Sequence, residues 1–290
     1  MTINTNISSM FANTSLTNTN NSLYLSMEKL SSGLRINKAA DDPSGLAIAD
    51  KLRTQTSSLS QSVHNASLAI SLLQIADKAM SEQSNILDTI KQKLIQGTND
   101  TTSAEGRSIL STEIGALLNQ FDSIATQTRF QDKYLLQKDV NDTDKTEKIA
   151  FILGEHAYDT SEARDGIQAN TAGLATGGTL TLASLKTDAL SANGISDENF
   201  SLYMDIIDQS IDDLNTFRSD YGSVQQQVES TMRNLITQKT SMANAESVIR
   251  DVNYMEEFAK LKQSIISYEA GSFALTQANL MKEGALKILI

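Results

Sequence analysis

The sequence contains no cysteine, no tryptophan, one proline and only two histidines in 290 residues. Without cysteine the chain has no disulfide, no thiol nucleophile and no thiolate metal site. His64 and His156 have no ligand partners at useful spacing, and the sequence contains no phosphate-binding glycine loop and no hydrolase or metalloprotease motif. We therefore expect no enzyme activity, no catalytic residue, no metal and no cofactor.

Basic residues and long apolar runs are also scarce. The chain has 24 Lys and Arg against 35 Asp and Glu, a formal net charge of −11, which argues against nucleic-acid binding by phosphate neutralisation. No run approaches the roughly 18 apolar residues of a membrane span, so we expect no membrane insertion. The first residues lack the basic and apolar regions of a cleavable signal peptide, and this feature alone predicts a cytosolic protein.

The charge is concentrated in one part of the chain. Residues 139–198 hold eleven acidic and four basic side chains, a net −7, and they include a glycine-rich stretch at 173–178. This composition predicts a solvated, loop-rich segment. Short β-prone runs at 129–136, 148–154 and 178–182 are the strand candidates.

The rest of the chain is rich in helical patterns. Between Gly45 and Gly97 there is no proline and no aromatic residue, and apolar side chains recur every seven residues, at Leu52, Leu59, Ala66, Leu73, Met80, Leu87 and Leu94. Seven apolar residues in succession at this spacing predict a long helix with a coiled-coil seam. Asp42 is placed to cap its first turn, with Pro43 at the first helical position.

Other apolar stripes predict further helices at 103–128, 204–235, 254–289 and along the first 34 residues, with a turn at 97–100. The fold class is therefore mainly α: an elongated antiparallel helical hairpin or coiled-coil rod with a small β element in the middle of the chain. The terminal stripes have no globular body to pack against, which points to burial by other chains.

Several long motifs resemble those of bacterial flagellins. The run from Leu30 to Ala49, LSSGLRINKAADDPSGLAIA, is similar to their N-terminal signature, and Ile3–Asn6 looks like their opening. The segments at 218–225, 229–235, 245–252 and 277–279 resemble the flagellin C-terminal region and occur in the same order. The likeness covers about residues 1–138 and 200–290.

The resemblance implies a structural subunit that polymerises into the flagellar filament for swimming motility. It implies five parts: an N-terminal inner-core helix (1–43), rod-layer helices with the start of a β-hairpin (44–138), a short, outward-facing acidic variable region (139–198), a C-terminal rod-layer helix (199–249) and a C-terminal inner-core helix (250–290). Two sets of residues follow. The rod seam is Leu52, Leu59, Leu73, Met80, Leu87 and Leu94, and filament assembly is assigned to Ile3, Ile7, Leu23, Leu30, Leu34, Phe258, Leu261, Ile265, Leu275, Leu286 and Leu289.

The resemblance also implies partners and a destination. These are further copies of the chain, an export chaperone at the C-terminal segment, and hook-associated and cap proteins; co-assembly with other flagellins is left open. Flagellins leave the cell through a type III export channel without a cleavable signal peptide, so the expected location is the extracellular filament. The terminal arms would become ordered in the polymer, where neighbours bury their stripes.

One departure from the family concerns innate immune recognition. Many flagellins carry an Arg and a Glu on the first long helix that contact the vertebrate flagellin receptor. Aligning residues 87–96 with that motif places Thr89 and Gln92 at these positions. Both charges are missing, so the resemblance implies weak receptor activation.

Two alternatives remain at the level of sequence. The hook–filament junction protein is related to flagellin at both ends, but residues 46–49 and 245–247 favour flagellin. A helical coiled-coil scaffold or signalling protein would share the heptads but would not need the signature runs.

Overall fold

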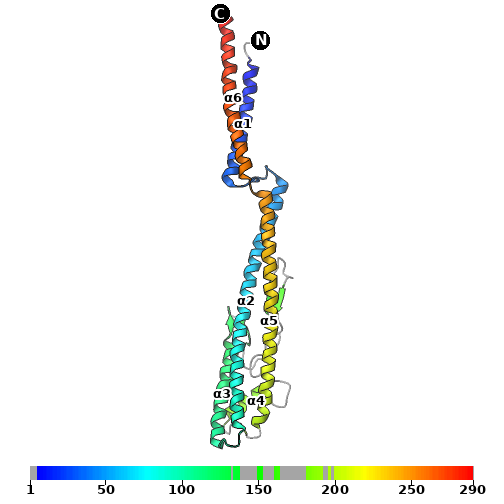
Figure 1. The fold of residues 1–290 in the computed structure, drawn as a ribbon, viewed down its shortest axis with the longest axis vertical. Helices are drawn as coiled ribbons and strands as arrows, with labels where there is room; N and C mark the ends of the chain where they lie inside the picture. The colour runs from blue at the N-terminus through cyan, green and yellow to red at the C-terminus, as the bar shows by residue number, and fades with distance from the viewer. Residues whose placement is uncertain are drawn as a thin grey trace. The chain divides into compact units, whose positions relative to one another are not determined.

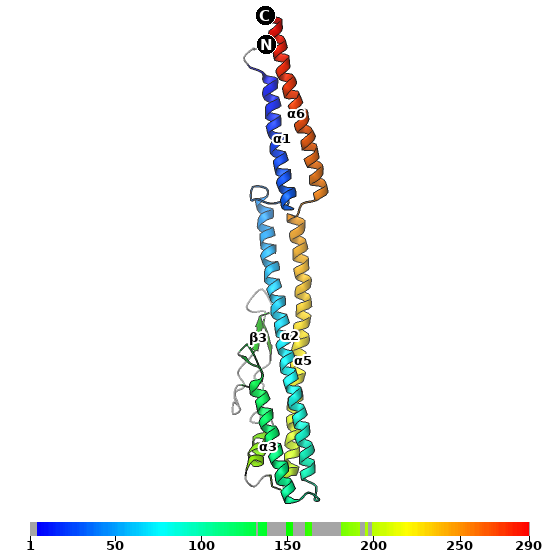
Figure 2. The same cartoon turned by 90° about the vertical axis from the view of Figure 1, so that its left-hand side faces the viewer.

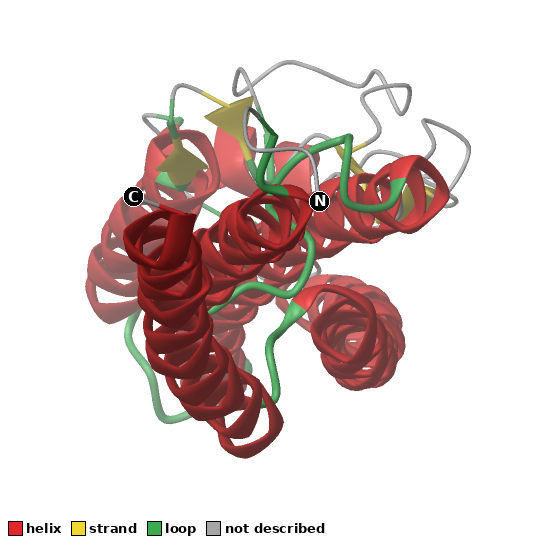
Figure 3. Ribbon diagram, turned by 90° about the horizontal axis from the view of Figure 1, so that it is seen from above, coloured by secondary structure: helices red, strands yellow, loops and turns green. Residues whose placement is uncertain are grey.

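The computed structural model describes residues 5–131, 133–137, 149–152, 160–163, 181–191, 195–196 and 199–289. In chain order the elements are α1 (Ile7–Ser32), α2 (Pro43–Gly97), α3 (Ala104–Gln127), β1 (Arg129–Phe130), β2 (Lys133–Tyr134), β3 (Ile149–Ile152), β4 (Thr160–Ala163), α4 (Leu182–Leu190), α5 (Asn199–Arg250) and α6 (Tyr254–Leu289) (Figure 1). Helix predominates over strand throughout the described chain (Figure 3). The expectation of a mainly α fold with a small β element is confirmed.

The start of α2 follows from its sequence. The Asp42 carboxylate accepts a hydrogen bond from the backbone N–H of Gly45 (2.9 Å), and Pro43 is the first helical residue. Gly97 ends the helix, and α3 begins after Ser103, whose hydroxyl accepts from the N–H of Gly106 (3.1 Å). Side-chain capping of otherwise unpaired amides explains why both helices begin where the sequence predicts.

The chain divides into two compact units, which are described separately. The central unit comprises residues 58–238, and the terminal unit comprises residues 1–57 and 239–290. In the central unit α2 and α5 lie side by side, with α3 alongside (Figures 1 and 2). Its core contains the rod-seam residues Leu59, Leu73, Met80, Leu87 and Leu94, all buried, whereas Leu52 is partly buried and belongs to the terminal unit.

Two charged residues interrupt the apolar spacing of α2, and each pairs with α5. The Arg218 guanidinium bonds to the Asp77 carboxylate (3.0 Å), and Lys91 forms an ion pair with Asp208. These pairs are partly exposed, so they keep both charges hydrated and add little to stability by themselves.

Helix α4 was not expected from the sequence. The strand expected at 178–182 is wrong at its end, because the Thr181 hydroxyl accepts from the N–H of Ser184 (3.1 Å) and Leu182 opens a helix. Leu182, Leu185 and Ala189 are buried in the central core. This part of the acidic segment is therefore packed structure rather than solvated loop.

Buried polar groups in and around α4 have partners. Lys186 forms an ion pair with Asp122 of α3, and the Tyr203 hydroxyl donates to the Asp188 carboxylate (2.5 Å). Burial, reinforced by this bond, raises the pKa of Tyr203 well above the usual phenol value. A hydrogen-bonded buried tyrosine and ion pair hold α4 in one position on α3 and α5.

The strands form two antiparallel pairs. β1 pairs with β2 around Gln131, whose φ of 46° makes the tight turn, as expected for a hairpin within 129–136. β3, within the run expected at 148–154, pairs with β4, which the sequence did not indicate. Residues 178–180 and most of 139–180 lie outside the described residues.

Alanine substitutions at two glycines of the central unit should change the free energy of unfolding in opposite directions. A Cβ at Gly97 would lie 2.3 Å from Cε1 of the buried Phe200 ring, whereas a Cβ at Gly222 in α5 would meet nothing within 4 Å. We expect Gly97→Ala to lower the free energy of unfolding by about 1–3 kcal/mol through overpacking. Gly222→Ala should raise it by about 0.5–1 kcal/mol, because alanine loses less backbone entropy in a helix. Urea unfolding of the monomers measures both, and equal effects would contradict the packing at Gly97.

Candidate assembly surface

In the terminal unit, α1 and α6 run side by side in opposite directions (Figures 1 and 2). Contacts along their length define the register. The Asn6 side-chain amide donates to the carbonyl of Ala278 (3.0 Å), Leu16 lies against Gly271, and the Ser26 hydroxyl donates to the Glu257 carboxylate (2.7 Å). Residues from the two ends of the chain are thus brought into one helix pair.

The seam between these helices mixes leucine with small and polar side chains. Many of the partly or fully buried positions follow alternating steps of three and four residues, as in a coiled coil. On α1 these are Ser9, Ala12, Leu16, Thr19, Leu23, Ser26 and Leu30; on α6 they include Glu257, Leu261, Ser264, Gly271, Leu275 and Ala278. Such a seam covers its leucines only partly and leaves the opposite faces of both helices in water.

Further large apolar side chains face away from the seam. On α6 they include Met255, Ile266, Phe273 and Leu280, and on α1 they include Ile7, Met10, Phe11 and Leu25, all of them exposed. At about 100° per residue, the four α6 positions fall within roughly 40° of one another, opposite the seam. Phe11 and Phe273 are 73% and 74% exposed. We call these two faces the outer apolar faces.

The structure separates the expected assembly residues into three groups. Ile7 and Phe258 are exposed. Those that are partly buried are Leu23, Leu30, Leu34, Leu261, Ile265 and Leu275. Ile3 and the side chains of Leu286 and Leu289 lie outside the described residues.

The sequence interpretation treated all of these stripes as one surface, and it missed Phe11, Met255, Ile266 and Phe273. The spacing of seven residues through 266, 273 and 280 is the signal that could have found the α6 face.

Both expected inner-core helices are shorter than predicted. α1 ends at Ser32 rather than near residue 40, because Gly33 takes a left-handed conformation (φ 74°) and its N–H bonds to the carbonyl of Lys29. Leu34 therefore lies beyond the helix, in an antiparallel bridge to Asp251. At the other end of the chain, α5 continues to Arg250 and α6 begins only at Tyr254.

Hydrogen bonds connect the segment between α1 and α2 to the segment between α5 and α6; we call this connection the joint. The N–H of Arg35 donates to the carbonyl of Arg250 (2.6 Å), and the N–H of Val252 donates to the carbonyl of Gly33 (3.0 Å). The Arg35 guanidinium adds two bonds to the carbonyl of Ile249. The chain between α1 and α2 is thus tied to the chain between α5 and α6.

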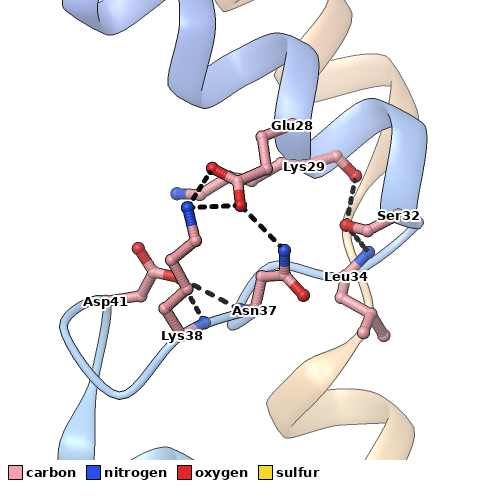
Figure 4. Close-up of polar contacts among 7 residues, drawn as sticks. All are labelled: Glu28, Lys29, Ser32, Leu34, Asn37, Lys38 and Asp41. Atoms are coloured by element: carbon pink, nitrogen blue, oxygen red, sulfur yellow. Dashed lines mark hydrogen bonds and ion pairs between the residues drawn. The ribbon is translucent and has the colours of Figure 1, made fainter.

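A polar cluster fixes the loop between α1 and α2 (Figure 4). The Glu28 carboxylate accepts from the Lys38 ammonium (2.9 Å) and the Asn37 amide (3.0 Å). The Asp41 carboxylate accepts from the backbone N–H groups of Asn37 (3.0 Å) and Lys38 (2.9 Å). These bonds lower the pKa of Glu28 and of Asp41, and the Glu28 carboxylate raises the pKa of Lys38.

Comparison with known proteins identifies the family. Residues 3–141 match the family model of the bacterial flagellin N-terminal helical region, and residues 204–289 match that of the C-terminal helical region. The chain is 33% identical over 297 residues to the flagellar filament 33 kDa core protein of Treponema phagedenis, covering all of both chains. It belongs to the bacterial flagellins.

Other relatives agree. This flagellin is 31% identical over 303 residues to the flagellin of Bacillus subtilis strain 168, again over the full length of both. Among solved structures, it resembles the crystal structure of Bacillus cereus flagellin with a TM-score of 0.46 and 25% identity, covering 63% of this chain and 94% of that one. Flagellins are structural subunits that polymerise into the flagellar filament, not enzymes.

No described helix is both long and apolar enough to cross a membrane. Within the same residues, no group of three or more His, Asp or Glu side chains is placed to hold a metal ion.

Acid should loosen the loop between α1 and α2. Carboxylates with a lowered pKa stabilise the folded state above their unfolded-state pKa, and that contribution is lost as pH falls through the lowered folded-state pKa. We expect the amide protection factors of residues 33–42 in assembled filaments, taken relative to the intrinsic exchange rate at each pH, to fall in that acidic range. Glu28→Gln should lower these protection factors at neutral pH, whereas Asp88→Asn, on an exposed face of α2, should not. Protection factors that respond neither to acid nor to Glu28→Gln would contradict the role of the cluster.

Proposed function

We propose that the outer apolar faces of α1 and α6 drive assembly of this flagellin by packing against neighbouring subunits. The observation that supports this is the set of exposed apolar side chains: besides the partly buried leucines of the seam, each helix carries large apolar side chains on its opposite face, in contact with water. An exposed apolar surface of this extent is characteristic of an interaction site.

The free energy available is large enough for polymerisation. Burying one large apolar side chain contributes about 1.5–3 kcal/mol, and each subunit offers about eight on the outer faces. Association and ordering of the arms cost on the order of 4–15 kcal/mol. Several side chains must therefore be covered together, which makes assembly cooperative.

Family membership supports proposals about partners and export. We propose that the subunit leaves through the flagellar export channel, that an export chaperone covers the C-terminal segment beforehand, and that hook-associated and cap proteins contact the ends of the filament. The exposed face of α6 supports the chaperone proposal, because it needs cover in the cytoplasm before assembly. A hook–filament junction role is the alternative, and purified subunits that stop at a short layer instead of growing long filaments would indicate it.

Charge placed on the outer faces should abolish filament growth. Phe11→Asp or Phe273→Asp would bury an unpaired carboxylate at a subunit contact, so we expect the critical concentration to rise at least about 100-fold, with the thermal unfolding of the central unit unchanged. Phe273→Leu, which keeps the face apolar, should assemble within a few-fold of the parent. Leu261→Asp with Ile265→Asp should also prevent growth, but by disturbing the α1–α6 pairing. Normal filaments from Phe273→Asp in electron micrographs would overturn the proposal.

We also propose weak recognition by the vertebrate flagellin receptor. Gln92 is exposed on α2, and Thr89 is partly buried with its hydroxyl bonded to the carbonyl of Asn85 (2.9 Å), so neither position offers a charge. In a receptor reporter assay we expect the monomer to be at least about tenfold less potent than a flagellin with both charges, since charge-assisted contacts of this kind are worth about 1.5–3 kcal/mol. The Thr89→Arg, Gln92→Glu double variant should gain potency. Full potency of the unmodified monomer would refute the proposal.

A further inference from the structure

The methionines of this chain are unevenly distributed. Of the eight methionines whose side chains the structure describes, four are exposed, and all four lie on α1 and α6: Met10 (61%), Met27 (50%), Met255 (83%) and Met281 (71%). Met80 in the central core is fully buried, and Met204, Met232 and Met242 are partly buried. Exposed thioethers are thus found, among the side chains that the structure describes, only on the two helices that carry the outer apolar faces.

We propose that these four methionines form an oxidation-sensitive site that controls whether the subunit can assemble. A peroxide transfers one oxygen to the exposed thioether sulfur: the O–O bond breaks, an S–O bond forms, and hydrogen peroxide is reduced to water while the sulfur is oxidised by two electrons. The product, methionine sulfoxide, is polar and chiral where the thioether was apolar and flexible.

The position of the methionines makes this change consequential. Met10 adjoins Phe11 on the outer apolar face of α1, and Met255 lies on the same face of α6 as Ile266 and Phe273. Met27 and Met281 are exposed on the same two helices, outside these faces. A sulfoxide oxygen brought into an apolar contact loses its hydrogen bonds to water and finds no donor there. This inference rests on the proposed function, because it requires that neighbouring subunits cover these faces.

The same geometry limits when oxidation can occur. Before assembly the four thioethers are open to water, and oxidation follows exposure. Inside the filament they would be covered, so a subunit that assembles with its methionines reduced is protected from then on. Oxidised subunits would be rejected at the growing end, and methionine sulfoxide reductases would restore their competence.

The test uses full-length monomers and filaments treated with hydrogen peroxide. Peptide mass spectrometry follows each methionine, and seeded elongation follows assembly. We expect the four exposed methionines to oxidise first in the monomer, Met80 last, and all four at least about tenfold more slowly in filaments. Elongation by the oxidised monomer should fall at least about tenfold, and reductase treatment should restore it.

The control is the variant with all four exposed methionines replaced by leucine. It should elongate equally well before and after peroxide. If it elongates poorly before treatment, recovery of the oxidised parent protein on reductase treatment decides the question.

The outcomes separate the two proposals. Equal oxidation rates at the four positions in monomer and filament would show that the outer faces stay uncovered, which overturns the proposed function. Protection in the filament combined with undiminished elongation by fully oxidised monomer would overturn the oxidation inference alone. Loss of elongation that reductases do not reverse would also overturn it.

Discussion

A pair of helices can bury only one stripe on each, and this limit governs the terminal unit. In α1 and α6 that stripe combines partly buried leucines with serine, threonine, alanine and glycine, and it includes the buried Ser26–Glu257 hydrogen bond. Phe11, Met255 and Phe273 face the other way. A single subunit therefore leaves a large apolar surface in water. We propose that neighbouring copies cover it, since flagellins polymerise into the filament.

In the central unit the apolar stripe of α2 is covered within one chain. There α2 packs against α3 and α5, so that Leu73, Met80, Leu87 and Leu94 are fully enclosed. Charged residues that interrupt the heptad pair with residues on α5, and Leu182 and Leu185 of α4 complete the core. Two sets of contacts fix the chain where α1 ends and α6 begins. They are the joint between Gly33–Arg35 and Arg250–Val252 and the Glu28–Lys38–Asp41 cluster.

The sequence predicted those features that depend on residues close together in the chain, and it missed those that depend on contacts between distant segments. The heptad of α2 and the Asp42 and Ser103 caps act within a few residues, so the helix boundaries there were predictable. The end of α1 at Ser32 was missed, because Leu34 and Ile36 continue the apolar spacing beyond it. The left-handed Gly33 and the joint to residues 249–252 show why the helix stops there. Helix α4 was missed because its β-prone neighbours hid a Thr181 cap, and its stability depends on distant contacts with α3. The division between seam and outer faces also required the register of α1 against α6, which no single stripe contains.

The central claim is that neighbouring subunits cover the outer apolar faces, and cryo-electron microscopy of the filament at side-chain resolution tests it most directly. We predict that Phe11, Ile266 and Phe273 lie within contact distance, about 4–4.5 Å between carbon atoms, of side chains from other subunits. Filaments in which these three side chains instead face solvent would contradict the account.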